Sequence, residues 1–251
     1  MTDRQTLHAE CLEMTTRNIH NRPGFVLVSC LLVIVLVYAG TNAIRTMAAE
    51  LTAYPVIHRM RIDFNRPSVP ATQERQDMLA KLHKAVALQP DNPFLLRWLG
   101  NAYMQGYRYT SNSDRAAIAA RQDAVRYFRQ AIALRPSWPH DRIDYLLAKF
   151  RLGEIDGDFY RQLLYANRLG PWEAWVQQIT AEIGLQLGER LPGDMQEIIT
   201  DSILNGVQHP LGYGEMLEIL RRYNSLDRVC GEVSSKQVRV YCDRFYTPDH
   251  S

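Results

Sequence analysis

The hydrophobic and polar positions divide the chain into one long apolar run near its start and a series of amphipathic stretches after it. Residues 25–44 are twenty consecutive positions without a charged side chain, and the first fifteen are almost entirely Val, Leu, Ile, Phe and Tyr. A helix needs about 20 residues to cross the apolar core of a bilayer. The run therefore predicts a transmembrane helix, assigned to residues 24–45.

Two other interpretations of this run are less favourable. A soluble core helix of this length is expected to carry a polar stripe, and this run has none. A cleaved signal peptide has a short basic start and an apolar stretch of about 7–15 residues, whereas 23 residues precede this longer run.

Residues 46–71 are predicted to form a tether. Pro55 is expected to end or kink the helix that leaves the membrane. The segment 66–70, RPSVP, favours extended chain because proline fixes φ and disfavours helix at the preceding residue. A short helix at residues 56–64 fits between them.

From residue 72 the pattern becomes helical and repeats. Three stretches each end a helix at an alanine that a proline follows five residues later, and these pairs are Ala85/Pro90, Ala131/Pro136 and Ala166/Pro171. The alanines are 46 and 35 positions apart. A period near 34 is typical of helix–turn–helix repeats.

These residues resemble the tetratricopeptide repeat. The positions that fit its first helix are Leu99, Gly100 and Tyr103, and those that fit its second helix and turn are Ala124, Phe128, Ala131 and Pro136. The first unit has twelve extra residues around 106–123, expected to lengthen the loop and the second helix. The third unit has Gly184 where the family has an aromatic residue. The resemblance implies repeats over residues 72–190.

Residues 191–251 are expected to cap the repeats. QEIITDSILNG predicts a helix that ends at Gly206, and GYGEMLEILRRYNSL predicts another. KQVRVYC alternates, which predicts a short strand or an extended segment. The expected fold class is all-α: a single N-terminal transmembrane helix followed by a tetratricopeptide-like helical-hairpin solenoid with a helical C-terminal cap.

The cysteines bear on topology. Cys230 and Cys242 are twelve residues apart, and such a pair favours a disulfide in an oxidising compartment, the alternative being two free thiols in the cytosol. The positive-inside rule favours a cytoplasmic N-terminus only slightly, because two arginines lie shortly before the apolar run and three lie within about 17 residues after it. The disulfide therefore favours a cytoplasmic tail at residues 1–23 and a C-terminal part outside the cytoplasm.

Charge and motifs give little indication of catalysis. The 29 basic and 27 acidic residues are interspersed, so we expect no nucleic-acid partner. HExxH, GxSxG and Gly-rich phosphate loops do not occur in the sequence. Asp156-Gly157-Asp158 matches a fragment of a calcium loop, but a helix N-cap explains it better. We expect no enzyme, no cofactor and no metal site.

A binding groove is more plausible. In the tetratricopeptide family the first helix of each pair lines a concave groove. The matching polar positions, the candidate binding residues, are Arg97, Asn101, Gln105, Gln178 and Glu182. An ordinary solvated helix face is the alternative, and Ile143 and Leu147 interrupt the stripe in the second unit.

The four tryptophans lie near the turns that join repeats. They are Trp98, Trp138, Trp172 and Trp175. Their rings have two interpretations: platforms for stacking sugars, or wedges between helix pairs.

The whole architecture, with the stretch RLGPWEAWVQ and the C-terminal cysteine pair, resembles VpsP-like bacterial polysaccharide-biosynthesis proteins. The resemblance implies a non-catalytic scaffold in exopolysaccharide assembly or export, anchored in the inner membrane through residues 24–45 with a periplasmic C-terminal domain. Its partners would be membrane proteins of that machinery. A chaperone-like module for secreted proteins, such as those of cytochrome or pilus biogenesis, is the alternative.

Overall fold

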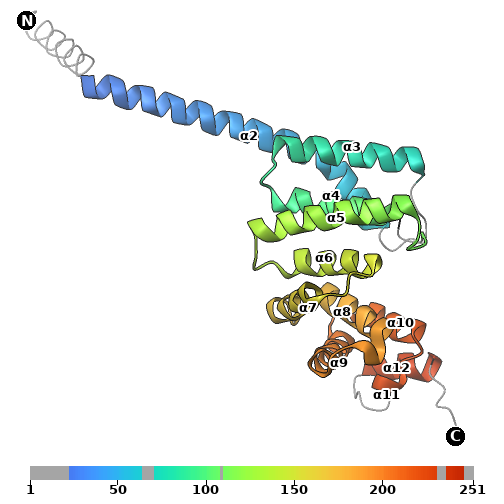
Figure 1. Ribbon diagram of the computed structural model, residues 1–251. Helices are drawn as coiled ribbons and strands as arrows, with labels where there is room; N and C mark the ends of the chain where they lie inside the picture. Colours follow the sequence, from blue (N-terminus) through green and yellow to red (C-terminus); the bar gives the residue numbers. More distant parts are fainter. Residues whose placement is uncertain (1–22, 64–70, 108–109, 231–235, 246–251) are drawn as a thin grey trace, which may run out of the picture. The chain divides into compact units, whose positions relative to one another are not determined.

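The computed structural model describes residues 23–63, 71–107, 110–230 and 236–245, and every regular element among them is a helix (Figure 1). This confirms the all-α class for the described residues. In chain order the elements are α2 (Pro23–Asp63), α3 (Thr72–Leu88), α4 (Pro93–Gln105), α5 (Arg115–Leu134), α6 (Pro139–Leu152), α7 (Gly157–Leu169), α8 (Ala174–Leu187), η1 (Gly188–Arg190), α9 (Gly193–Gln208), α10 (Tyr213–Arg222), α11 (Asp227–Cys230) and α12 (Lys236–Phe245).

The chain divides into two compact units within α2, between Leu51 and Thr52. In the first unit α2 is long and apolar enough to span a membrane, and none of its most apolar window is buried. Two of its hydroxyl groups are satisfied within the helix, because those of Thr41 and Thr46 donate to the carbonyls of Tyr38 and Asn42, each at 2.9 Å. Internal hydrogen bonding of this kind is what a bilayer core requires. Of the expected tail at residues 1–23, residues 1–22 lie outside the described residues, and Pro23 begins α2.

The second unit begins inside α2, where the sequence predicted a tether. Pro55 does not end the helix, which continues to Asp63. Pro55 is exposed, whereas Val56, Ile57 and Met60 are buried on another face. The backbone hydrogen bond that proline cannot make is therefore lost on the solvent side, and apolar burial holds the helix together beyond it. Residues 64–70, including the expected extended segment, lie outside the described residues.

From α3 onward the helices pack in chain order. Each helix from α3 to α9 contacts the next one, and α4, α6, α7, α8 and α10 also contact the next but one. A small residue lets α4 and α5 pack closely: a Cβ added to Gly100 on α4 would lie 2.7 Å from the ring of Phe128 on α5. The expected lengthening also occurs, since α5 has 20 residues and α7 has 13.

The predicted alanine–proline pairs mark equivalent helix ends. The carbonyls of Ala85, Ala131 and Ala166 accept the N–H of the residue that ends their helix, at 3.1, 3.0 and 3.0 Å. The prolines then lie in the turns that follow. The helices end at Leu88, Leu134 and Leu169, three residues after the alanines and before the prolines. Local sequence therefore predicted these three helix ends to within one turn.

The C-terminal segment corrects one prediction. Residues 236–242, expected as a strand or extended segment, belong to the helix α12. Val238 and Cys242, four residues apart, are buried, while Val240 between them is 62% exposed. The helical spacing thus decides which residues face the core, and the apparent alternation does not.

Candidate functional site

The candidate binding residues lie on α4 and α8, with α6 between them. All five are partly buried. Three of them, Arg97, Asn101 and Glu182, bond to side chains of α6 that the sequence did not single out. We call the side chains that join α4, α6 and α8, listed here, the polar network: Arg97, Asn101, Asp144, Arg151, Trp175 and Glu182.

Asp144 is the centre of the polar network. Its side chain is 2% exposed. Arg97 Nε and Asn101 Nδ2 on α4 donate to Oδ2 at 2.6 and 3.0 Å, and Trp175 Nε1 on α8 donates to Oδ1 at 2.8 Å. One buried carboxylate therefore links three helices, and its charge is compensated by Arg97.

A second buried carboxylate lies one turn earlier on α6. Arg135 donates to both oxygens of Asp141, from Nε at 2.6 Å and from Nη2 at 2.7 Å. Arg97 Nε is 3.8 Å from the same carboxylate. Burial raises the pKa of Asp141, and the hydrogen bonds from Arg135 oppose that rise.

The remaining candidates on α8 also bind within the protein. Glu182 accepts from Arg151 Nη2 of α6 at 3.2 Å, and the hydroxyl of Tyr223, which ends α10, lies 3.5 Å from the same oxygen. Gln178 Nε2 donates to the carbonyl of Gly212, just before α10, at 3.2 Å. Four of the five candidates are thus engaged between neighbouring helices.

Gln105 is the exception. Its Oε1 is buried and has no hydrogen-bond partner among the described residues, and the same holds for Trp98 Nε1 on the same helix. The ring of Trp98 instead lies under the guanidinium of Arg61, 5.3 Å from the ring centroid. These two polar atoms are therefore the ones on α4 that the internal bonding leaves open to a water or a ligand.

On α6, the sequence placed the groove-facing side chains one residue too early. Ile143 and Leu147, taken as the groove positions, pack in the apolar core. Asp144, next to Ile143, faces the polar residues of α4 and α8 instead. In the sequence, the acidic pair Asp141 and Asp144 lies between the two segments that carry the polar candidates, and this pair could have indicated the contact.

The acidic sequence around Asp156 forms a helix start. Asp156 Oδ1 accepts the N–H of Phe159 at 2.8 Å, which confirms the predicted N-cap. Lys149 Nζ, 4% exposed, donates to both Asp156 oxygens and lies 3.7 Å from Asp158. Its hydrogen bond lowers the pKa of Asp156, and the ammonium occupies the position between the carboxylates. In the described part of the chain, no three His, Cys, Asp or Glu are grouped to hold a metal ion.

The tryptophans divide into two pairs. Trp98 and Trp175 are partly buried between helices, as the wedge interpretation expected. Trp138 and Trp172 are 45% and 68% exposed at the turns before α6 and α8. The wedge interpretation is therefore wrong for this second pair.

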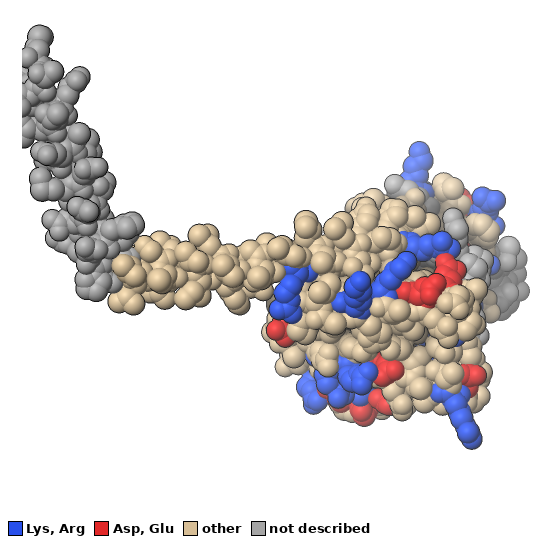
Figure 2. Space-filling model, turned by 90° about the horizontal axis from the view of Figure 1, so that it is seen from above, with Lys and Arg blue, Asp and Glu red and all other residues tan. Residues whose placement is uncertain are grey.

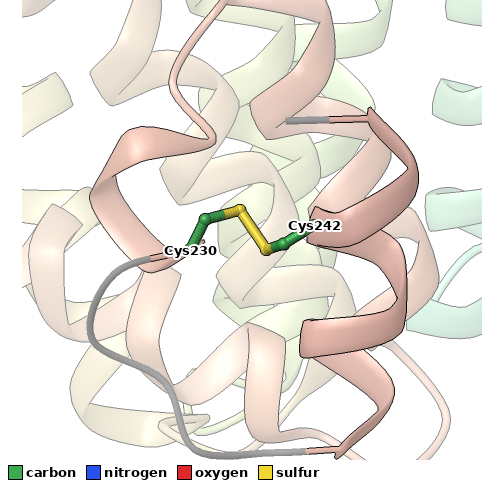
Figure 3. The surroundings of a disulfide bond; sticks show 2 residues. All are labelled: Cys230 and Cys242. Carbon is green, nitrogen blue, oxygen red and sulfur yellow. A yellow bond between two sulfur atoms is a disulfide. The ribbon is translucent and has the colours of Figure 1, made fainter. Parts of the chain in front are cut away.

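A disulfide joins Cys230 of α11 to Cys242 of α12, with 5.6 Å between the Cα atoms (Figure 3). Tyr241, beside the bridge, donates from its hydroxyl to Glu218 of α10 at 2.7 Å. These two links hold α12 against the preceding helices.

On the face seen in Figure 2, Lys and Arg are interspersed with Asp and Glu over the second unit.

Comparison with known proteins does not assign a family, since no family model and no curated protein matches this chain.

Proposed function

We propose that this chain is a single-pass membrane protein whose repeats form a tetratricopeptide-like solenoid that acts as a scaffold without catalysis. In this arrangement the last turns of α2 pair with α3, and α4/α5, α6/α7 and α8/α9 form successive hairpins. The helices α10 to α12 cap the final hairpin. The contacts of α4 with α5, α6 with α7 and α8 with α9 support the hairpins. The ion pair between Arg59 and Glu74 joins the last turns of α2 to α3.

The polar network is the observation that carries the proposal. Arg97, Asn101 and Glu182 bind to side chains of α6. Such bonds stiffen the stack of first helices and fix its curvature. A chaperone-like groove that captures peptides would first have to break the 2.6 Å contact between Arg97 and the buried Asp144, so a rigid scaffold is favoured over that alternative.

The cellular role follows from the resemblance to VpsP-like proteins. We propose that the scaffold lies on the periplasmic side of a bacterial inner membrane and organises membrane proteins of an exopolysaccharide assembly or export machinery. The apolar helix and the Cys230–Cys242 disulfide support this location. No nucleic acid, metal or cofactor is required.

The test uses a deletion strain and three complementing chains. These are the full chain, the full chain with Asp144→Ala, and a chain that ends after residue 71. Surface polysaccharide is expected to return with the full chain and to fall with the other two, at equal protein level in the membrane. Unchanged polysaccharide in the deletion strain would refute the role.

Two further measurements separate the parts of the proposal. A reporter enzyme fused after Ser251 is expected to be active only in the periplasm. Crosslinking of the full chain in membranes, followed by purification in detergent, is expected to recover glycosyltransferases or polymerases. Recovery of pilin or cytochrome assembly proteins instead would favour the chaperone-like alternative.

A further inference from the structure

Four turns of one design occur among the residues that the structure describes. They span Gln89–Asn92, Arg135–Trp138, Gly170–Glu173 and His209–Gly212, and in each the last N–H donates to the first carbonyl, at 3.2, 3.1, 3.2 and 3.3 Å. A proline is the second residue of every turn. Sequence reasoning found the first three turns and missed the fourth. Figure 1 shows the α3–α4 and α5–α6 connections on the same side of the stack.

Consecutive turns touch one another. A Cβ added to Gly170 would lie 2.9 Å from Pro139, the residue after the second turn. A Cβ added to Gly212 would lie 2.7 Å from Ala174, the residue after the third. The second, third and fourth turns therefore form one continuous border, which we call the turn edge.

The turn edge exposes large apolar side chains. Single exposed apolar residues are ordinary, but here they recur at equivalent places. A leucine closes α5 and α7 just before the turn, and an apolar residue directly follows the proline in the third and fourth turns. The residues and their exposed fractions are Leu134 44%, Trp138 45%, Tyr165 45%, Leu169 41%, Trp172 68% and Leu211 89%.

Arginines accompany these aromatic rings. The guanidinium of Arg142 lies 5.4 Å from the ring centroid of Tyr165, and that of Arg135 lies 5.3 Å from the centroid of Trp138. Arg168, beside Leu169, is exposed. Aromatic and aliphatic side chains with interspersed arginine are typical of segments at the interface between bilayer and water.

The second unit begins near the first of the four turns. Arg59 on α2 pairs with Glu74 near the start of α3 at 2.7 Å, and Pro55 lines a shallow groove with Lys81, farther along α3. The last turns of α2 are therefore antiparallel to α3. Thr52, the first residue of the unit, consequently lies toward the end of α3 that leads into the first turn.

We propose that the turn edge is a lipid-binding surface that docks onto the headgroup region of an anionic bilayer. The two exposed tryptophans and Tyr165 lie at headgroup level, the three leucines enter the outer acyl region, and the exposed Arg168 attracts lipid phosphates. Exposed leucines favour a bilayer over a glycan, because sugars present hydroxyl groups to their binding sites. The inference rests on the proposed membrane anchoring and not on the role in polysaccharide assembly.

The test places a fluorescent label at the most exposed position of the edge. Full-length protein with Cys11→Ser, Cys30→Ser and Leu211→Cys is labelled with the environment-sensitive dye NBD while the disulfide stays oxidised. It is reconstituted in phosphatidylcholine vesicles with or without phosphatidylglycerol, and the quencher is lipid brominated on its acyl chains. Glu189→Cys, exposed in η1 at the opposite end of α8, is the matched control.

We expect bromolipid to quench the label at position 211, more strongly with phosphatidylglycerol, and to leave the label at position 189 unchanged. Arg168→Gln is expected to lower the ratio of docked to undocked chains about fivefold in the anionic vesicles. Absence of quenching at 211, or equal quenching at both positions, would overturn the proposal. So would protection of position 211 only after a membrane-protein extract or a polysaccharide is added, since the edge would then bind that partner.

A failed docking test would leave the scaffold role intact, because deletion and complementation measure that role separately. Conversely, docking in pure lipid vesicles needs no polysaccharide machinery. The two proposals can therefore fail independently.

Discussion

Replacing Asp144 by alanine is expected to weaken the second unit substantially. The change removes the acceptor for three donors, on Arg97, Asn101 and Trp175. Removing one partner of a buried ion pair costs about 3–5 kcal/mol. The Arg97 side chain is 18% exposed and stays 3.8 Å from Asp141, so part of its charge remains compensated. We therefore expect the lower end of that range, about 3 kcal/mol, or a roughly 150-fold larger unfolding constant.

The measurement is urea unfolding of the full chain in detergent micelles, followed by far-UV circular dichroism and extrapolated linearly to water. In a thermal melt the same loss corresponds to about 6–12 °C for a unit of this size. Asp201→Ala removes an exposed carboxylate from α9 and is expected to stay within about 0.5 kcal/mol of the wild type. If Asp144→Ala unfolds like Asp201→Ala, the polar network does not hold the helices together, and the scaffold argument fails with it.

Three further predictions concern packing, the disulfide and pH. Gly100→Ala is expected to lower the free energy of unfolding by about 1–3 kcal/mol, because its methyl group would meet Phe128. Gly214→Ala, whose methyl group would have no atom within 4 Å, should unfold no earlier than the wild type. Equal stabilities of the two variants would contradict the close packing. Reductant is expected to destabilise the wild type by about 3 kcal/mol and to leave Cys242→Ser unaffected, and an identical response in both would show that the bridge contributes nothing. Hydrogen bonds from neighbouring side chains lower the pKa of Glu218 from 4.5 to about 2. Its stabilising effect is therefore present above pH 4.5 and is lost as the pH falls toward 2. Thermal melts of Glu218→Gln should show a smaller loss of stability in acid than melts of the wild type, and parallel plots of stability against pH would refute this.

Part of the candidate site was accessible from the sequence. The family pattern placed Arg97, Asn101, Gln178 and Glu182 on first helices, and the structure finds all four between neighbouring helices. Their partners were not accessible. Asp144 is 47 positions from Arg97, and its direction depends on how α6 is rotated against its neighbours. A spacing rule that is one residue in error turns the side chain by about 100°.

The exposure of the tryptophans shows the same limit. All four lie near turns in the sequence, yet Trp175 donates to a buried carboxylate while Trp172, three residues earlier, is 68% exposed. Local sequence places both near the start of α8. Only the arrangement of the surrounding helices decides which ring is covered.

The sequence by itself determined the elements whose cause is local: the uncharged run of α2, the helix ends before Pro90, Pro136 and Pro171, and the N-cap at Asp156. Composition, proline geometry and side-chain capping act within a few residues, so they can be recognised without a fold. The tertiary structure decided the continuation of α2 past Pro55, the helical state of α12 and the bonding of the polar stripe. In each of these cases burial against distant helices outweighs the local preference, and that energy depends on residues that the local pattern does not contain.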